Sequence, residues 1–158
     1  MLVNNSNLTT IWVDENDQQI KIIDQRLLPH KLSIVTLNSV KEVEFAIREM
    51  QVRGAPLIGV TAAFGMYLAA LEDPSIEFIN KAGDFLIQSR PTAVNLSWAV
   101  KKIKLEISNI DQQNRTEHIF NIAKQIREED INACSKIGDY GLELIKSLNS
   151  LKFWSRGG

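Results

Sequence analysis

The sequence offers little for disulfide or metal chemistry. One cysteine, Cys134, and two histidines, His30 and His118, occur among its 158 residues. A lone cysteine cannot close an internal disulfide, so nothing points to a disulfide-stapled secreted scaffold. These three side chains also leave little for a zinc site.

Neither sign of charge is in excess. The chain has 18 lysines and arginines against 19 aspartates and glutamates, which gives a formal net charge of −1. Dedicated nucleic-acid binders normally carry a large basic excess, so we expect no nucleic-acid partner.

Long hydrophobic runs and a targeting sequence are also absent. Residues 1–10 are polar and rich in asparagine, without the basic start and apolar centre of a signal peptide. The longest apolar run, residues 57–71, is shorter than the roughly 20 residues of a spanning helix. The run therefore favours a buried helix, and we expect no membrane partner and a cytoplasmic location.

What remains is an ordinary globular composition, with 44% hydrophobic and 23% charged residues. Residues 10–13, 19–24 and 32–37 are predicted to be strands, and a polar turn at 14–17 joins the first two in a hairpin. Such a small sheet has one apolar face that needs helices to pack on.

Helical spacing takes over after residue 38. Ser39 and Glu42 form a capping box for a first helix, which we expect to end near Arg53 with Gly54 in the left-handed conformation. Four more helices are predicted. The first two span residues 56–71 and about 75 to just before Pro91, and the third follows an Asn95 cap. The last follows a polar turn at 111–114 and a Thr116 cap, and Gly138 and Gly141 are points where it could break.

The predicted fold class is therefore α+β. A small N-terminal antiparallel β-sheet (residues 1–38) precedes a bundle of about five α-helices (residues 39–150), and residues 151–158 form a tail.

Arg53, Gly54 and Ala55 stand just before Pro56, which suits the first turn of a helix. The start of a helix presents free backbone N–H groups and a partial positive charge. Glycine lets a ligand approach the backbone, and arginine adds a bidentate donor. The segment has the chemistry of a phosphate cradle. A turn between two helices with a solvated arginine is the plainer alternative.

Arg90 repeats this arrangement before a later helix. Pro91 pushes Arg90 out of helical geometry, and Asn95 is a good cap a few residues on. Taken singly, the segment reads as a loop between helices, but two such arginines in one small domain favour an anion site.

The other polar candidates are weaker. Residues 24–26 (Asp-Gln-Arg) read as a charged strand end, and His30 and His118 as solvated side chains. Cys134 reads as a buried small hydrophobe rather than a nucleophile.

Several segments, in this order, resemble the N-terminal part of the methylthioribose-1-phosphate isomerases. They are residues 24–29 (DQRLLP), 50–59 (MQVRGAPLIG), 89–96 (SRPTAVNL) and 137–141 (IGDYG), and the resemblance runs from about residue 10 to 148. The superfamily includes the regulatory subunits of translation initiation factor 2B and ribose-1,5-bisphosphate isomerase. Asn95 and Leu96 favour the methylthioribose enzyme.

The resemblance implies conversion of an aldose 1-phosphate to a ketose 1-phosphate in methionine salvage, by an acid–base pair of a cysteine and an aspartate. It implies no metal or organic cofactor, a sugar-phosphate ligand, and a homodimer for the full-length enzyme. Carried over by position, Arg53, Gly54 and Ala55 contact the substrate and Arg90 clamps its phosphate.

One departure from the family pattern concerns the catalytic pair. Family members are roughly twice as long, and a second, doubly wound α/β domain supplies their cysteine and aspartate. Cys134 precedes the glycine-rich segment and is not that cysteine, and residues 151–158 do not match the family. We therefore expect an N-terminal portion that lacks the catalytic domain and is inactive alone. The alternatives are a non-catalytic binding or regulatory module, like the translation-factor subunits, a ribose-1,5-bisphosphate isomerase, and a pseudogene product without function.

Overall fold

Three short strands form the predicted antiparallel sheet. The structure is a computed structural model that describes residues 2–3, 6–7, 9–14 and 19–150. Strand β4 (Ile20–Ile23) lies between β3 (Ile11–Val13) and β5 (Ile34–Leu37), with Ile11 opposite Ile22 and Ile20 opposite Leu37. A further antiparallel pair, β1 (Leu2–Val3) and β2 (Ser6–Asn7), was not predicted from the sequence.

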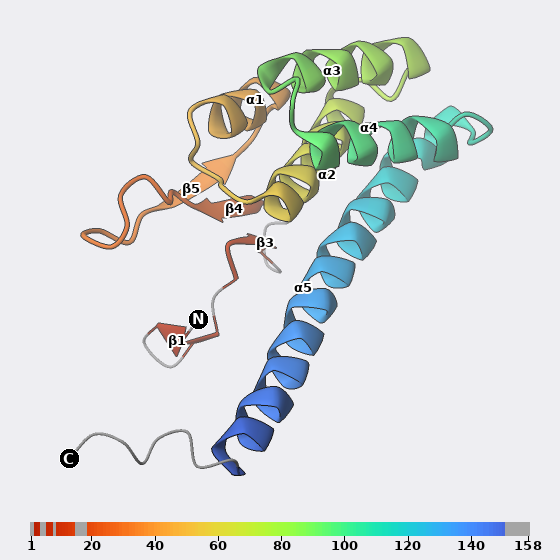
Figure 1. Cartoon of the computed structure of the whole chain (residues 1–158). Coiled ribbons are helices and arrows are strands. Elements are labelled where there is room, and N and C mark those ends of the chain that lie inside the picture. The colour runs from red at the N-terminus through yellow and green to blue at the C-terminus, as the bar shows by residue number, and fades with distance from the viewer. Residues whose placement is uncertain (1, 4–5, 8, 15–18, 151–158) are drawn as a thin grey trace.

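Five helices follow the sheet, as the sequence predicts. They are α1 (Val40–Arg48), α2 (Ala55–Glu72), α3 (Ile76–Ser89), α4 (Val94–Glu106) and α5 (Gln112–Ser150). Helix α2 packs against each of the other four, while α5 starts beside the bundle and extends away from it (Figure 1).

Helix α2 is central because it is apolar nearly all round and carries small residues where its neighbours cross it. A Cβ on Gly65 would lie 2.8 Å from Val43 Cγ1 of α1 and 2.9 Å from Leu86 Cδ1 of α3. Within the described residues α2 is the one helix long and apolar enough to cross a membrane, and 72% of that stretch is buried inside the fold. The sequence prediction of a buried helix is confirmed.

One apolar core joins the sheet to the helices. Side chains of β4, such as Ile20 and Ile22, belong to the same buried cluster as Val43 of α1 and Phe64 of α2. The apolar face of the sheet is therefore covered by the helices, as the sequence requires of so small a sheet.

Helix α1 begins as predicted but ends about five residues early. The Ser39 side chain accepts from the Glu42 N–H at 3.3 Å, while the Glu42 carboxylate accepts from the Asn38 N–H at 2.7 Å rather than from Ser39. The helix stops at Arg48 because the chain then turns back to bury Val52. Met50 adopts the left-handed conformation (φ 58°), so Gly54 does not cap this helix.

Two later helix starts were also placed wrongly. Ala93 is the N-cap of α4, so Asn95 lies in the first turn of the helix. Helix α5 begins at Gln112, within the predicted polar turn, and Thr116 is no cap: its hydroxyl donates to the Ala70 carbonyl of α2 at 2.9 Å. This hydrogen bond between helices satisfies the threonine side chain without a helix end.

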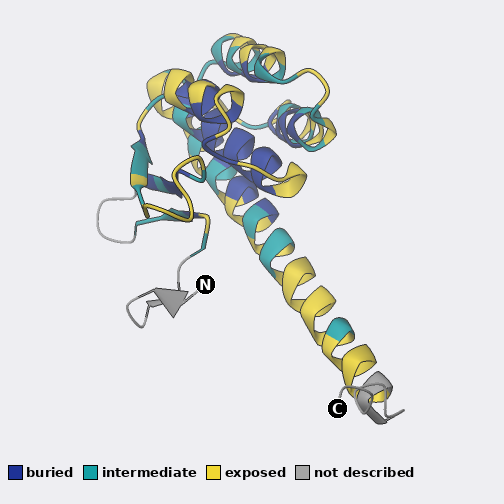
Figure 2. Ribbon diagram, turned by 60° about the vertical axis from the view of Figure 1, so that its left-hand side comes forward, coloured by how far each residue is buried: buried dark blue, intermediate teal, exposed yellow. Residues whose placement is uncertain are grey.

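The second half of α5 differs from the prediction in two ways. The helix continues unbroken through Gly138 and Gly141, where a Cβ would meet nothing within 4 Å. Glycine costs only about 1 kcal/mol in a helix interior, which long flanking stretches of helix can offset. Cys134 was predicted to be buried but is exposed, since this half of the helix projects beyond the bundle (Figure 2).

Candidate anion-binding site

Helix α2 begins with an open N-terminus. Gly54 is its N-cap, with φ 97° and ψ 133°, a conformation that L side chains rarely adopt. Because glycine has no side chain, no side-chain hydrogen bond caps this end, and Arg53, Gly54 and Ala55 are all exposed. The helix start at Gly54 and Ala55 is therefore exposed, with the partial positive charge of the helix, although Pro56 contributes no N–H and Leu57 is buried.

Arg53 is held beside this helix start. Its Nε donates to the Met50 carbonyl oxygen at 3.4 Å, which leaves the rest of the guanidinium for another acceptor. In the described part of the chain, no carboxylate forms an ion pair with Arg53.

Arg90 occupies a similar place before α4. Its backbone (φ −153°, ψ 77°) ends α3 outside helical geometry, as Pro91 predicts, and its carbonyl accepts from the Ala93 N–H at 2.9 Å. The N-cap of α4, Ala93, likewise provides no side-chain hydrogen bond. By contrast, Ser39 and Ser75 cap α1 and α3. The two helices preceded by the predicted arginines are thus the two whose starts are left open, among these four.

The first two turns of α2 lie against the first turn of α4. A Cβ on Gly59 would stand 2.9 Å from the Asn95 carbonyl oxygen, so only glycine allows this approach. A cavity of about 160 Å³ lies at the crossing, lined by Pro56, Gly59, Val60, Asn95, Trp98, Ile126, Glu129 and Asp130. Pro56 and Asn95, which follow the two predicted segments, thus line one cavity, but Arg53 and Arg90 are not among its lining residues. Arg90 has no carboxylate ion-pair partner among the described residues.

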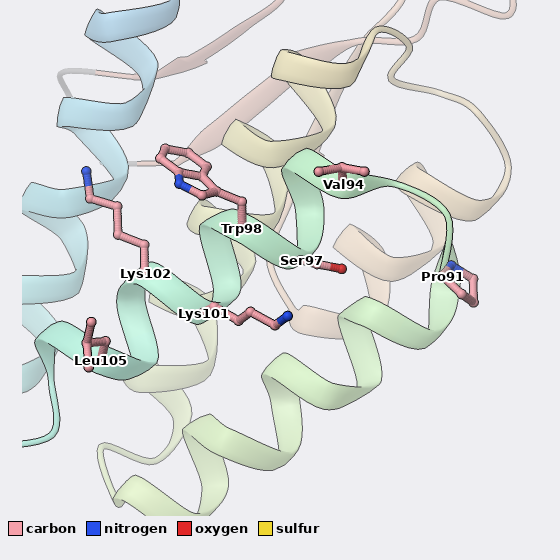
Figure 3. Close-up of a pocket in the computed structure, with 7 residues that line it drawn as sticks. All are labelled: Pro91, Val94, Ser97, Trp98, Lys101, Lys102 and Leu105. Atoms are coloured by element: carbon pink, nitrogen blue, oxygen red, sulfur yellow. The ribbon is translucent and has the colours of Figure 1, made fainter.

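A groove of about 690 Å³ runs along the exposed side of α4 from the same end. It is lined by Pro91, Val94, Ser97, Trp98, Lys101, Lys102 and Leu105 (Figure 3). The Lys102 ammonium stands 5.4 Å from the centre of the Trp98 ring, and Trp98 also lines the cavity at the crossing. Sequence analysis did not single out these α4 residues, because nothing local marks which face of a helix adjoins a cavity.

An ion pair between the buried Asp24 and the exposed Arg26 adjoins Gln51, two residues before Arg53, and the sequence analysis did not predict it. Asp24 is 3% exposed, and its carboxylate accepts from Arg26 Nη2 at 2.7 Å, Arg26 Nε at 3.0 Å and Gln51 Nε2 at 2.9 Å. The Arg26 hydrogen bond is the main cause that lowers the pKa of Asp24 to about 2, with the Gln51 amide adding to it against the opposing effect of burial. Residues 24–26 do follow the end of β4 and Arg26 is exposed, as predicted, but the sequence analysis did not foresee that Asp24 is buried.

The remaining candidates stand apart from this site. His30 is exposed, and His118 Nε2 lies 3.9 Å from Glu106 Oε2 at the α4–α5 end of the bundle. Among the described residues no group of three or more histidine, cysteine, aspartate or glutamate side chains gathers where a metal ion could be held.

Comparison with known proteins places the chain in a family. The Initiation factor 2 subunit family matches residues 51–151, and the chain belongs to it. A methylthioribose-1-phosphate isomerase of Methylocella silvestris is 45% identical over 148 residues, which are 94% of this chain and 40% of that protein.

Solved structures agree with this assignment. The 5-methylthioribose 1-phosphate isomerase of Pyrococcus horikoshii superposes with a TM-score of 0.77 at 36% identity, over 85% of this chain and 40% of its own. Subunit delta of translation initiation factor eIF-2B from A. fulgidus superposes with a TM-score of 0.79 at 35% identity, over 87% of this chain and 42% of its own. The predicted α+β fold and the resemblance are confirmed, and the chain spans about two fifths of the length of each of these three relatives.

Proposed function

We propose that this chain forms the N-terminal, phosphate-binding part of a methylthioribose-1-phosphate isomerase. The isomerases to which it is similar span it almost entirely, at up to 45% identity. The regulatory-module alternative shares the fold but is not favoured, because the curated relative described above bears the isomerase name.

The observation that carries the proposal is the pairing of two open helix starts with two arginines. A phosphate monoester carries close to two negative charges at neutral pH, and helix N-termini and guanidinium groups are the protein groups that bind it best. Arg53 and the Gly54 and Ala55 backbone would hold one side of the phosphate. Arg90, reaching from the turn before α4, would hold the other side.

In this proposal the chain binds and orients the substrate, and the second domain of the isomerase family supplies the catalytic acid and base. The resemblance assigns proton transfer to a cysteine and an aspartate, and neither matches a residue of this chain. Cys134 is exposed on α5, where its Sγ lies 4.0 Å from Asp130 Oδ1. The 158 residues alone are therefore expected to bind a sugar phosphate and to turn none over, because orientation without an acid and a base leaves the chemical step uncatalysed.

A titration with ribose 1-phosphate, followed by amide chemical shifts in NMR, tests the binding role. Saturable shifts are expected at Gly54 and Ala55, and Arg53→Ala or Arg90→Ala should each weaken binding about tenfold or more, since a charge-assisted hydrogen bond contributes about 1.5–3 kcal/mol.

Arg48→Ala is the matched control, because Arg48 is also exposed but is already paired with Glu44 and Glu49. It removes the same charge and should change affinity less than about twofold. Affinities that fall equally in all three variants would show that only overall charge matters. Isomerase turnover by this chain alone would contradict the proposed division of labour.

A further inference from the structure

Gln51 stands two residues before Arg53 and is held on three sides. Its side-chain amide donates to Asp24 Oδ2 at 2.9 Å in a buried contact across 27 residues of sequence. Its backbone N–H donates to the Ala46 carbonyl of α1 at 2.9 Å, and its carbonyl accepts from the Gln25 N–H at 2.9 Å. We infer that Gln51 is a positioning residue, which, anchored on the Asp24–Arg26 pair, sets where Arg53 and Gly54 stand at the start of α2.

The segment that follows Gln51 has little freedom of its own. Val52 is completely buried in the core, and Arg53 Nε is tied back to the Met50 carbonyl at 3.4 Å. Met50 has φ 58°, which is uncommon for a residue other than glycine and persists only where surrounding contacts impose it. The contacts of Gln51 help to impose it, together with the hydrogen bonds from the Met50 N–H to the Ile47 carbonyl and from the Val52 N–H to the Ala46 carbonyl, both at 3.3 Å.

The Asp24–Arg26 ion pair that Gln51 contacts acts on the site by fixing the position of Gln51 and not by adding charge. Both Arg26 donors that meet Asp24 are committed to it, and the Arg26 guanidinium also lies 5.9 Å from the centre of the Phe45 ring. Asp24 in turn uses one oxygen for both Arg26 Nη2 and the Gln51 amide. A side chain so fully engaged gives the amide of Gln51 a rigid acceptor, and a loop already ordered loses less entropy when a phosphate binds.

The inference rests on the proposed phosphate-binding function, so its test uses a double-mutant cycle. Gln51→Leu removes the amide and keeps an apolar side chain of similar length. With ribose 1-phosphate as the probe, Gln51→Leu should weaken binding about tenfold in wild type and clearly less in an Arg53→Ala background, where only the part that acts through Gly54 remains. Additive losses would overturn the inference, because a general structural defect does not act through Arg53.

Thr116→Val is the control for destabilisation alone. It removes a hydrogen bond between helices at the opposite end of α2, to the Ala70 carbonyl. It should lower the melting temperature while leaving phosphate affinity within about twofold, since it leaves the Arg53 segment untouched. If Thr116→Val weakens binding as much as Gln51→Leu does, loss of stability explains both and positioning is refuted.

A readout without ligand separates the two proposals. In wild type the Arg53 Nε–Hε group should give one resolved NMR signal protected by its bond to Met50, and Gln51→Leu should broaden or shift it. If the probe does not bind wild type, the proposed function fails, and the inference is then judged by this signal alone. An unchanged Arg53 signal in Gln51→Leu overturns the positioning role whether or not the probe binds.

Discussion

Replacing Asp24 with asparagine should make the free energy of unfolding depend less on pH at acid pH. The Arg26 guanidinium, and after it the Gln51 amide, lower the pKa of the Asp24 carboxyl from 3.8 to about 2 in the folded state. A carboxyl that binds its proton more weakly when folded stabilises the folded state at pH above its unfolded pKa. This contribution declines as the pH falls from about 5 towards 2.

The magnitude follows from the size of that change in pKa. At about 1.4 kcal/mol per pKa unit, a fall from 3.8 to about 2 corresponds to about 2 kcal/mol of unfolding free energy at neutral pH. Asp24 is 3% exposed, but the side chain of its partner Arg26 is 36% exposed, so solvent screening makes this figure an upper value. The free-energy gap between wild type and Asp24→Asn should therefore shrink by at most about 2 kcal/mol from pH 6 to pH 2.

Urea unfolding followed by circular dichroism across this pH range measures the gap. Asp84→Asn is the control, because Asp84 pairs with Lys104 at 2.7 Å while its own side chain is 65% exposed. A pair so exposed contributes about 1 kcal/mol or less, and its loss should leave the wild-type profile nearly unchanged. Parallel profiles for wild type and Asp24→Asn would refute the account of the buried pair, as would equal flattening in the two variants.

Two further changes test the packing and the capping. Gly59→Ala should lower the free energy of unfolding by about 1–3 kcal/mol, because its Cβ would lie 2.9 Å from the Asn95 backbone oxygen. Gly138→Ala, whose Cβ meets nothing within 4 Å, should instead raise the helical circular dichroism signal at 222 nm. Equal effects of the two substitutions would contradict the close crossing of α2 and α4. Ser39→Ala should lower the urea-unfolding free energy by about 1 kcal/mol through loss of the α1 cap, and an unchanged midpoint would mean that this hydrogen bond contributes nothing.

Much of the candidate site was accessible from sequence because its signals are local. An arginine and a glycine directly before a proline that opens a helix identify Arg53 and Gly54 within four residues of chain. Arg90 is marked in the same way by Pro91. The structure puts the α2 and α4 helix starts together, whereas the roles of these residues in binding stay predictions.

The sequence by itself specified five helices and a three-stranded sheet, since hydrophobic spacing and the Ser39 cap act over a few residues. It did not specify where α1 ends, because burial of Val52 depends on the completed core. Nor did it show that Asp24 meets Gln51, 27 residues away, or that Gly59 faces Asn95. Contacts of this kind depend on how whole helices and strands pack. From the sequence, residues 24–26 therefore read as a charged strand end, and only the fold shows that Asp24 is buried against Gln51, two residues before Arg53.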